Sequence, residues 1–302
     1  MSSHGSTGAG GGSISGSIGG IGMAALEKRI EDFAALPPGS EPPRDLARVV
    51  NQLLEALESA AVRSAVRGAD GTWRAVPWVK RGILVGFRFG KLADLSPGGD
   101  AFSFVDKDTI PPQRFGTERN VRIVPGGSTI RRGVYVGPGV VCMPPMFVNV
   151  GAYVGAGTMV DSHALIGSCA QVGERCHVSA AAQIGGVLEP VNASPVIVED
   201  NVIVGGNCGV YEGTVVRANA VLAAGVVLTR GTPVYDLVRE RVYRASAEVP
   251  LEIPSGAVVV PGARAVKDGW GAAQGLSLQT PVIVKYRDEK TDVATALEGW
   301  LR

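Results

Sequence analysis

Branched aliphatic residues recur at every sixth position through the middle of the chain. From position 124 to position 184, all eleven residues in this frame are apolar. They are Val124, Ile130, Val136, Cys142, Val148, Val154, Val160, Ile166, Val172, Val178 and Ile184. Because 45% of the chain is apolar, such a run arises by chance only about once in several thousand trials. The repeat is therefore real, and it resumes in a shifted frame at Val198, Val204, Val210, Val216, Leu222 and Leu228.

A six-residue period matches neither an α-helix, which repeats every 3.6 residues, nor a strand, which repeats every two. Three six-residue units predict a triangular coil, with the aliphatic residue in an inner corner and a small residue, four positions later, pointing inward along a flat side. Successive coils then stack about 4.8 Å apart, one strand spacing. The predicted stacked pairs are Val154 on Val172, Val160 on Val178 and Ile166 on Ile184.

The fold class predicted by this repeat is mainly β, a left-handed parallel β-helix. Its handedness follows from the hexapeptide class, since strand physics alone favours right-handed crossovers. We expect a flexible Gly/Ser leader over 1–22, a small N-terminal α/β domain over 23–120 and the β-helix over 121–268. A loop, "GVLEPVNASPVIV", breaks the frame and should project from one corner. Residues 269–302 should cap the open end with a strand and a helix, because bare strand edges recruit other chains.

Composition narrows the classes of function. The charges nearly cancel, with 29 Lys and Arg against 28 Asp and Glu, so no net field favours nucleic acid or an anionic membrane. No apolar stretch approaches the 18 residues that a membrane span needs. Four cysteines without a CxxC pair, and no secretory signal, favour free thiols in a reduced cytoplasmic setting.

Two stretches of the chain carry a resemblance to a known family. The runs "MPPMFVNVGAYVGAGTMVDSHALIGSCAQVG" and "GGVLEPVNASPVIVEDN" resemble tetrahydrodipicolinate N-succinyltransferases, and the likeness extends over residues 23–302. The hexapeptides alone would indicate only the acyltransferase superfamily. The resemblance implies a homotrimer with active sites between neighbouring prisms, in lysine and diaminopimelate biosynthesis. Succinyl-CoA would donate the acyl group to the nitrogen of ring-opened tetrahydrodipicolinate, without a metal or a tightly bound cofactor.

Asp161 and Arg122 are the principal candidate site residues. Asp161 follows Val160, and its side chain should point outward, where a carboxylate could orient an ammonium and take its proton. Spacing alone would favour a solvated turn aspartate, but the resemblance makes Asp161 catalytic and substrate-binding. Arg122 precedes the first coil, and its guanidinium could grip one carboxylate of the acceptor through two hydrogen bonds. By resemblance it binds substrate; otherwise it would be a surface or trimer-contact residue.

One position departs from the family pattern. Many members carry a second functional glutamate in a Gly-Ala-Arg-Ser-Glu run, whereas this chain reads "GGNCG" and has Gly209 there. Glu212 could substitute as a catalytic residue or could be a turn residue. His163 is placed two residues after Asp161 and is a candidate for binding substrate, while His177 is interpreted as a structural turn residue.

The CoA site is marked only by exposed basic residues. No Gly-rich loop joins a strand to a helix, so neither a P-loop nor a dinucleotide fingerprint is present. Phosphates could lie near Arg230, Arg264 or Lys267, and Lys267 is preferred because "AVKDG" resembles the terminal turn of the family.

Three other functions use the same kind of prism. An acetyl-CoA-dependent N-acyltransferase, acting on a related amino acid or an amino sugar, would share the fold. A zinc carbonic anhydrase needs three histidine ligands per site, and the repeat holds only His163 and His177, 14 positions apart. An ice-binding prism would show outward threonine ladders, and a scaffold has no need of the aspartate together with the arginine.

Overall fold

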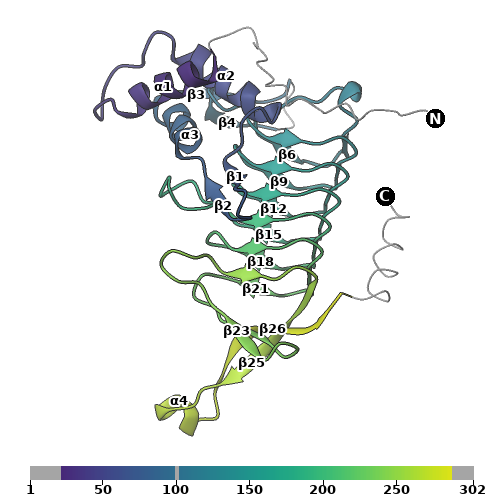
Figure 1. Cartoon of the computed structure of the whole chain (residues 1–302). Coiled ribbons are helices and arrows are strands. Elements are labelled where there is room, and N and C mark those ends of the chain that lie inside the picture. The colour runs from purple at the N-terminus through teal and green to yellow at the C-terminus, as the bar shows by residue number, and fades with distance from the viewer. Residues whose placement is uncertain (1–21, 99–101, 288–302) are drawn as a thin grey trace, which may run out of the picture.

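A parallel β-helix forms the body of the protein, in a computed structural model that describes residues 22–98 and 102–287. Figure 1 shows the stacked coils, with the N-terminal helices beside the first coils and a long hairpin beyond the last ones. Three ladders of stacked strands form the sides of the prism. We call these ladders side A, side B and side C, in the order in which the chain passes through them.

Each side is a parallel ladder of two-residue strands. Side A contains β5 (Arg122–Ile123), β8 (Val141–Cys142), β11 (Met159–Val160), β14 (His177–Val178), β17 (Ile203–Val204) and β20 (Val221–Leu222). Side B contains β6 (Thr129–Ile130), β9 (Phe147–Val148), β12 (Leu165–Ile166), β15 (Gln183–Ile184), β18 (Gly209–Val210) and β21 (Val227–Leu228). Side C contains β7 (Tyr135–Val136), β10 (Tyr153–Val154), β13 (Gln171–Val172), β16 (Ile197–Val198), β19 (Val215–Val216) and β24 (Glu252–Ile253).

The interior of the prism is a column of stacked aliphatic side chains. The three predicted stacked pairs are confirmed by the strand register: Val154 on Val172, Val160 on Val178 and Ile166 on Ile184. The small residues four positions after each aliphatic are buried as well: Ala152, Thr158, Ala164, Ala170, Cys176 and Ala182. Burying this apolar column contributes about 25 cal/mol per Å², and it needs no bulky aromatic residue.

The corners fall elsewhere than the sequence suggested. Each aliphatic residue is the second residue of a strand, so the expectation that it fills an inner corner is wrong. The turn follows it, and the residue three positions after the aliphatic commonly has a positive φ, as at Gly157 (67°) and His163 (62°). A left-handed residue there reverses the chain before the next strand, and this explains the frequent Gly and Asn at that position.

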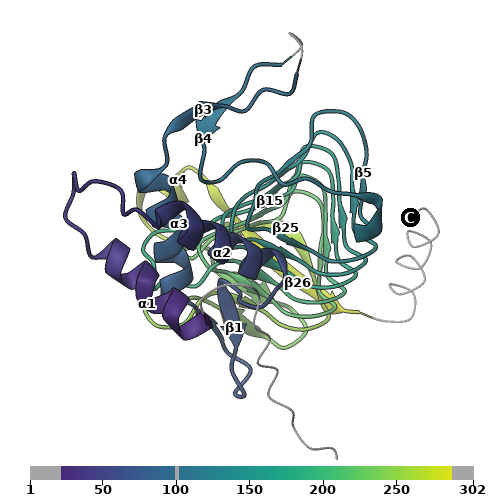
Figure 2. The same ribbon diagram turned by 90° about the horizontal axis from the view of Figure 1, so that it is seen from above.

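The N-terminal domain packs on the corner between sides B and C. It contains α1 (Met23–Ala34), α2 (Leu46–Glu58), α3 (Pro77–Phe89), the hairpin β1 (Ala65–Arg67) and β2 (Trp73–Ala75), the hairpin β3 (Leu92–Asp94) and β4 (Val105–Lys107), and the 3-10 helix η1 (Thr117–Arg119). Buried apolar residues of the three helices share one core with Val150 and Cys169 of this corner. The β1–β2 hairpin lies against side C, where it covers Ile197 and Val215. Figure 2 shows the β3–β4 hairpin extending away from the prism.

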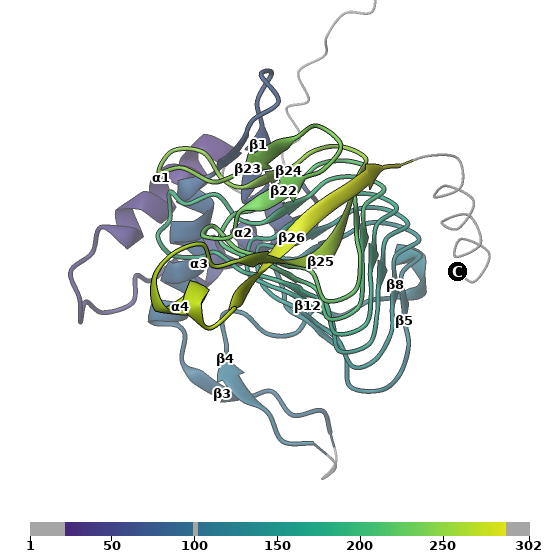
Figure 3. The same cartoon turned by 90° about the horizontal axis from the view of Figure 1, so that it is seen from below.

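The chain ends the prism with a long hairpin. The strand β25 (Ala257–Ala265) pairs with β20 in the last partial coil and continues into an antiparallel pair with β26 (Ser277–Tyr286). The strands β22 (Val234–Asp236) and β23 (Arg241–Tyr243) extend the same sheet, as Figure 3 shows from below, and α4 (Gly269–Ala273) joins β25 to β26. The hairpin therefore links residues on both sides of the expected boundary at 268. The predicted leader and the final predicted helix lie outside the described residues.

Candidate active site

Asp161 lies at the corner between sides A and B. It follows β11, and its side chain is 29% exposed, as the predicted outward direction requires. Its Oδ1 accepts a hydrogen bond from the backbone N–H of Ser162 at 2.7 Å, which fixes the carboxylate at the start of the turn. The other carboxylate oxygen lies 3.8 Å from Nε2 of His177. The corner therefore holds an acid and an imidazole side by side.

The histidine beside Asp161 is His177. It belongs to β14, so its interpretation as a turn residue is wrong, and its side chain is only 14% exposed. Its backbone stacks on Met159, and Asp161 lies two residues beyond Met159 on the same side of the prism. His163 is instead an exposed turn residue with a positive φ. In the sequence, the signal for the pair of Asp161 and His177 was their separation, which is two residues shorter than one 18-residue coil.

Arg122 lies on the same side of the prism as Asp161. It is the first residue of β5, it is exposed, and it pairs with Val141, which in turn pairs with Met159. Two coil spacings therefore separate Arg122 from the strand that precedes Asp161, about 10 Å along the prism axis. That distance suits a ligand with charged groups at both ends better than a direct ion pair.

Glu212 lies at a different corner, between sides B and C. It is an exposed turn residue with φ of 54°, and its Oε2 accepts the backbone N–H of Arg230 at 2.8 Å. This hydrogen bond ties two successive coils together, and a catalytic role for Glu212 stays a prediction. Asp161 and Glu212 do not share a corner of one chain.

A cavity of about 1020 Å³ opens beside Glu212. Its walls are the projecting loop over 185–194, the turn after β18 and the segment around 247–250. Arg230 lines it, and the Arg230 guanidinium donates to the carbonyl oxygens of Ser246 and Ala247. The loop is anchored from the N-terminal domain, because the fully buried Lys80 donates from Nζ to the carbonyl of Ala193 at 2.6 Å. Burial lowers the pKa of Lys80.

Lys267 is exposed between β25 and α4, on the hairpin that leaves the prism. Lys267 is not among the residues that line the large cavity. Its role as a CoA contact therefore stays a prediction.

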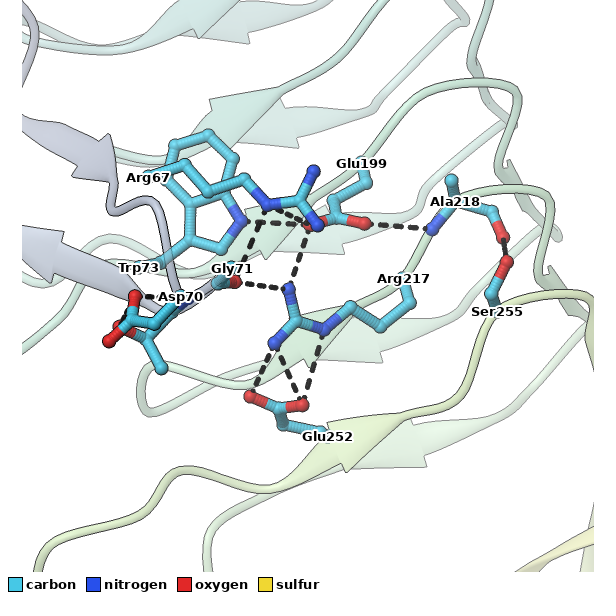
Figure 4. A network of polar contacts seen from close by, with 10 residues as sticks. Arg67, Asp70, Gly71, Trp73, Glu199, Arg217, Ala218, Glu252 and Ser255 are labelled. Carbon is cyan, nitrogen blue, oxygen red and sulfur yellow. Dashed lines mark hydrogen bonds and ion pairs between the residues drawn. The ribbon is translucent and has the colours of Figure 1, made fainter.

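A polar network that the sequence did not reveal joins the β1–β2 hairpin to side C (Figure 4). Arg217 donates to the carboxylates of Glu199 and Glu252 and to the carbonyl of Gly71, while Trp73 donates to Glu199 at 2.9 Å. Burial alone would raise the pKa of Glu199, but the donors around it hold the pKa below its ordinary value. The network fixes the hairpin on the prism.

Within residues 22–98 and 102–287, no three or more His, Cys, Asp or Glu residues cluster as a metal site would require. All four cysteines are buried and free. In the same part of the chain, no helix combines the length and apolar character needed to cross a bilayer.

Comparisons with known proteins agree with this architecture. A family model described as the hexapeptide repeat of succinyl-transferase matches residues 195–230. The repeat and the stacked coils thus define a hexapeptide-repeat transferase. A second model, the N-terminal part of tetrahydrodipicolinate N-succinyltransferase, matches residues 25–89.

Curated relatives give the family. The 2,3,4,5-tetrahydropyridine-2,6-dicarboxylate N-succinyltransferase of Bradyrhizobium diazoefficiens is 41% identical over 85% of this chain and 90% of its own length. The enzyme of the same name from Ralstonia nicotianae is 41% identical over 93% of this chain and 98% of its own. This chain belongs to the tetrahydropyridine-2,6-dicarboxylate N-succinyltransferase family.

Proposed function

We propose that this protein transfers a succinyl group from succinyl-CoA to the amino nitrogen of ring-opened tetrahydrodipicolinate, a step of lysine and diaminopimelate biosynthesis. Family membership supports the reaction, and the observation that carries the site is the Asp161 carboxylate, fixed at a coil corner 3.8 Å from His177. The buried free thiols fit a reduced cytoplasmic setting. The acetyl-CoA alternative is not favoured, because the relatives are named N-succinyltransferases.

The chemistry requires a neutral amine. Asp161 takes a proton from the substrate ammonium, and the neighbouring His177 imidazole can accept this proton in turn. The amine then attacks the thioester carbonyl, a C–N bond forms, the C–S bond breaks, and CoA leaves as a thiol after it receives the second amine proton. The product is N-succinyl-2-amino-6-oxopimelate. Arg122, exposed on the same side of the prism, binds a carboxylate of the acceptor.

The complete site requires more than one copy of the chain. Asp161 lies at the corner between sides A and B, whereas the large cavity lies at the corner between sides B and C. In a homotrimer of left-handed prisms, the corner of one copy would face the cavity of the next. Succinyl-CoA is then a co-substrate, with Lys267 as the proposed contact for its phosphates.

The test is a thiol-release assay with purified protein. Wild-type protein should release CoA from succinyl-CoA when tetrahydrodipicolinate is present, and acetyl-CoA should serve poorly. Asp161→Asn should keep the fold and lose at least about 100-fold in turnover, the usual contribution of a positioned acid or base. Asp200→Asn is the matched control, since Asp200 also accepts a backbone N–H at a corner of the prism. Near-normal turnover in Asp161→Asn would remove Asp161 from the mechanism.

A further inference from the structure

The β3–β4 hairpin, which extends away from the prism (Figure 2), exposes large apolar side chains. Leu92 is 72% exposed, Val105 63%, Phe102 60% and Phe104 51%. The rings of Phe102 and Phe104 stack on each other, with their centroids 6.0 Å apart. Together the four side chains present roughly 450 Å² of apolar surface, as much as the largest patch on a typical monomer, and such patches commonly mark an interface. A two-stranded hairpin is also only marginally stable by itself, so this one needs a partner surface.

The hairpin is held at the edge of side B. Its Asp106 pairs with Arg131, the residue that follows β6 of side B. Phe104 is two residues before Asp106, so strand alternation places its ring on the same face of the hairpin. On side B itself, Phe147 and Leu165 are the first residues of β9 and β12, and both side chains are partly exposed. The hairpin and side B can therefore contact the same neighbour.

Side A carries a second, different apolar surface. The first residues of its strands point outward, and Val141, Met159, Ile203 and Val221 are partly exposed. Unlike surfaces on two sides of one chain make a head-to-tail contact, which forms a ring when the rotation between copies closes. A second copy is also what the divided candidate site requires, since Asp161 and the large cavity lie at different corners. The occupant that fits the hairpin and side B is therefore side A of a second copy.

Height along the prism selects the residues that meet. A ring whose axis runs along the prism brings equal heights of neighbouring copies together. The hairpin is tied to the first coil through Arg131, and side A presents Val141 in its second strand and Met159 in its third. Asp161 lies two residues beyond Met159. The contact therefore borders the candidate site of the second copy.

We propose that the β3–β4 hairpin of one copy docks on side A of a second copy, with Phe102 and Phe104 against Val141 and Met159. The hairpin then covers one edge of the site that contains Asp161. Its four exposed side chains supply about half of the roughly 800 Å² that each partner buries in a stable complex, and side B contributes the remainder. The consequence for turnover rests on the succinyl transfer proposed above, but docking is measured without substrate.

The first experiment removes both aromatic rings. In the double variant Phe102→Ser, Phe104→Ser, light scattering should show a dissociation constant between copies that is raised at least about 100-fold, because buried aromatic residues dominate the energy of interfaces. Turnover should fall at low protein concentration and recover at high concentration, as mass action requires. Leu237→Ser is the matched control and should assemble as wild type, since Leu237 is 65% exposed in the turn after β22, at the other end of the prism. A wild-type protein that does not assemble, or a double variant that assembles with wild-type affinity, would overturn the proposal.

The second experiment keeps the assembly and probes the hairpin directly. All four native cysteines are buried, so Phe104→Cys introduces a single accessible thiol. In the assembled protein a thiol reagent should label Phe104→Cys at least about 10-fold more slowly than Leu237→Cys, and the two rates should converge once dilution separates the copies. Equal rates in the assembled protein would contradict docking. Slow labelling of a monomer would also contradict it, because the hairpin would then be covered by its own chain. A wild-type protein that assembles but transfers no succinyl group would refute the proposed function and leave the docking intact.

Discussion

Replacing Arg217 with methionine should loosen the contact between the β1–β2 hairpin and side C. The Arg217 guanidinium makes two hydrogen bonds at 2.9 Å, to Glu199 Oε1 and to the carbonyl of Gly71, and it pairs with Glu252 at 2.8 Å (Figure 4). The side chains of Arg217 and Glu199 are 17% and 9% exposed. Methionine retains apolar bulk but supplies no donor, so Glu199 keeps the hydrogen bonds from Trp73 and the backbone N–H of Ala218 and an ion pair with Arg67 at 3.7 Å.

Breaking a buried ion pair by removing one partner typically costs about 3–5 kcal/mol, because the remaining charge stays desolvated. Glu199 retains two hydrogen bonds, so we expect the low end, about 3 kcal/mol. For a chain of 302 residues, that is a drop in melting temperature of roughly 5 °C. The hairpin should also be cleaved faster by proteases, because its tether to the prism is lost.

The pH dependence of this loss is the sharper test. The pKa of Glu199 is lowered in the folded protein, so its stabilisation is present above the ordinary value of 4.5 and lost as the pH falls through the folded pKa. In Arg217→Met the pKa of Glu199 should rise. The gap in stability between wild type and variant should therefore be widest near pH 7 and shrink below about pH 4.5.

The assay is thermal unfolding followed by circular dichroism between pH 3.5 and 7.5. Arg175→Met is the matched control, because Arg175 pairs with Glu174 at 2.8 Å but both side chains are about half exposed. Exposed pairs contribute about 0–1 kcal/mol, so the control should melt close to wild type. A loss no larger than that of the control, or one that does not vary with pH, would refute the reasoning.

Two further predictions concern the core of the prism. Ile166→Ala removes a fully buried side chain that is stacked between Val148 and Ile184. Chemical denaturation should show a loss of about 3–4 kcal/mol in the free energy of unfolding. A loss below about 1 kcal/mol would contradict a tightly packed column. Burial raises the pKa of Cys142 to about 12 and that of Cys169 to about 11. A thiol reagent at pH 8 should therefore label neither cysteine until the protein is unfolded. Rapid labelling of the native protein would contradict the burial of these thiols.

The repeat made the prism predictable, because its period is a property of the local sequence. A side chain stacks on the residue one coil away, so counting in eighteens gave pairs such as Val160 on Val178 correctly. The stretch "KRGILVGFRFGK" contributes most of the helix α3, although the spacing of its apolar residues does not by itself distinguish a helix from a strand. Packing of α3 against α1 and α2 decided it.

The candidate site was only partly predictable. The motif around Asp161 marked the corner, but the sequence pointed to His163 as its neighbour, whereas folding brings His177 beside it from the next coil. The network of Glu199 with Trp73 joins residues 126 positions apart, and no local pattern records such a contact.

The sequence by itself determined the coil, the stacking of its aliphatic core and the family to which the chain belongs, because each depends on spacing along the chain or on contiguous motifs. The tertiary structure decided which polar groups meet. Contacts such as Asp161 beside His177 and Arg217 between two glutamates depend on side-chain direction and on the docking of separate segments. Those are properties of the folded surface, and a linear repeat does not encode them.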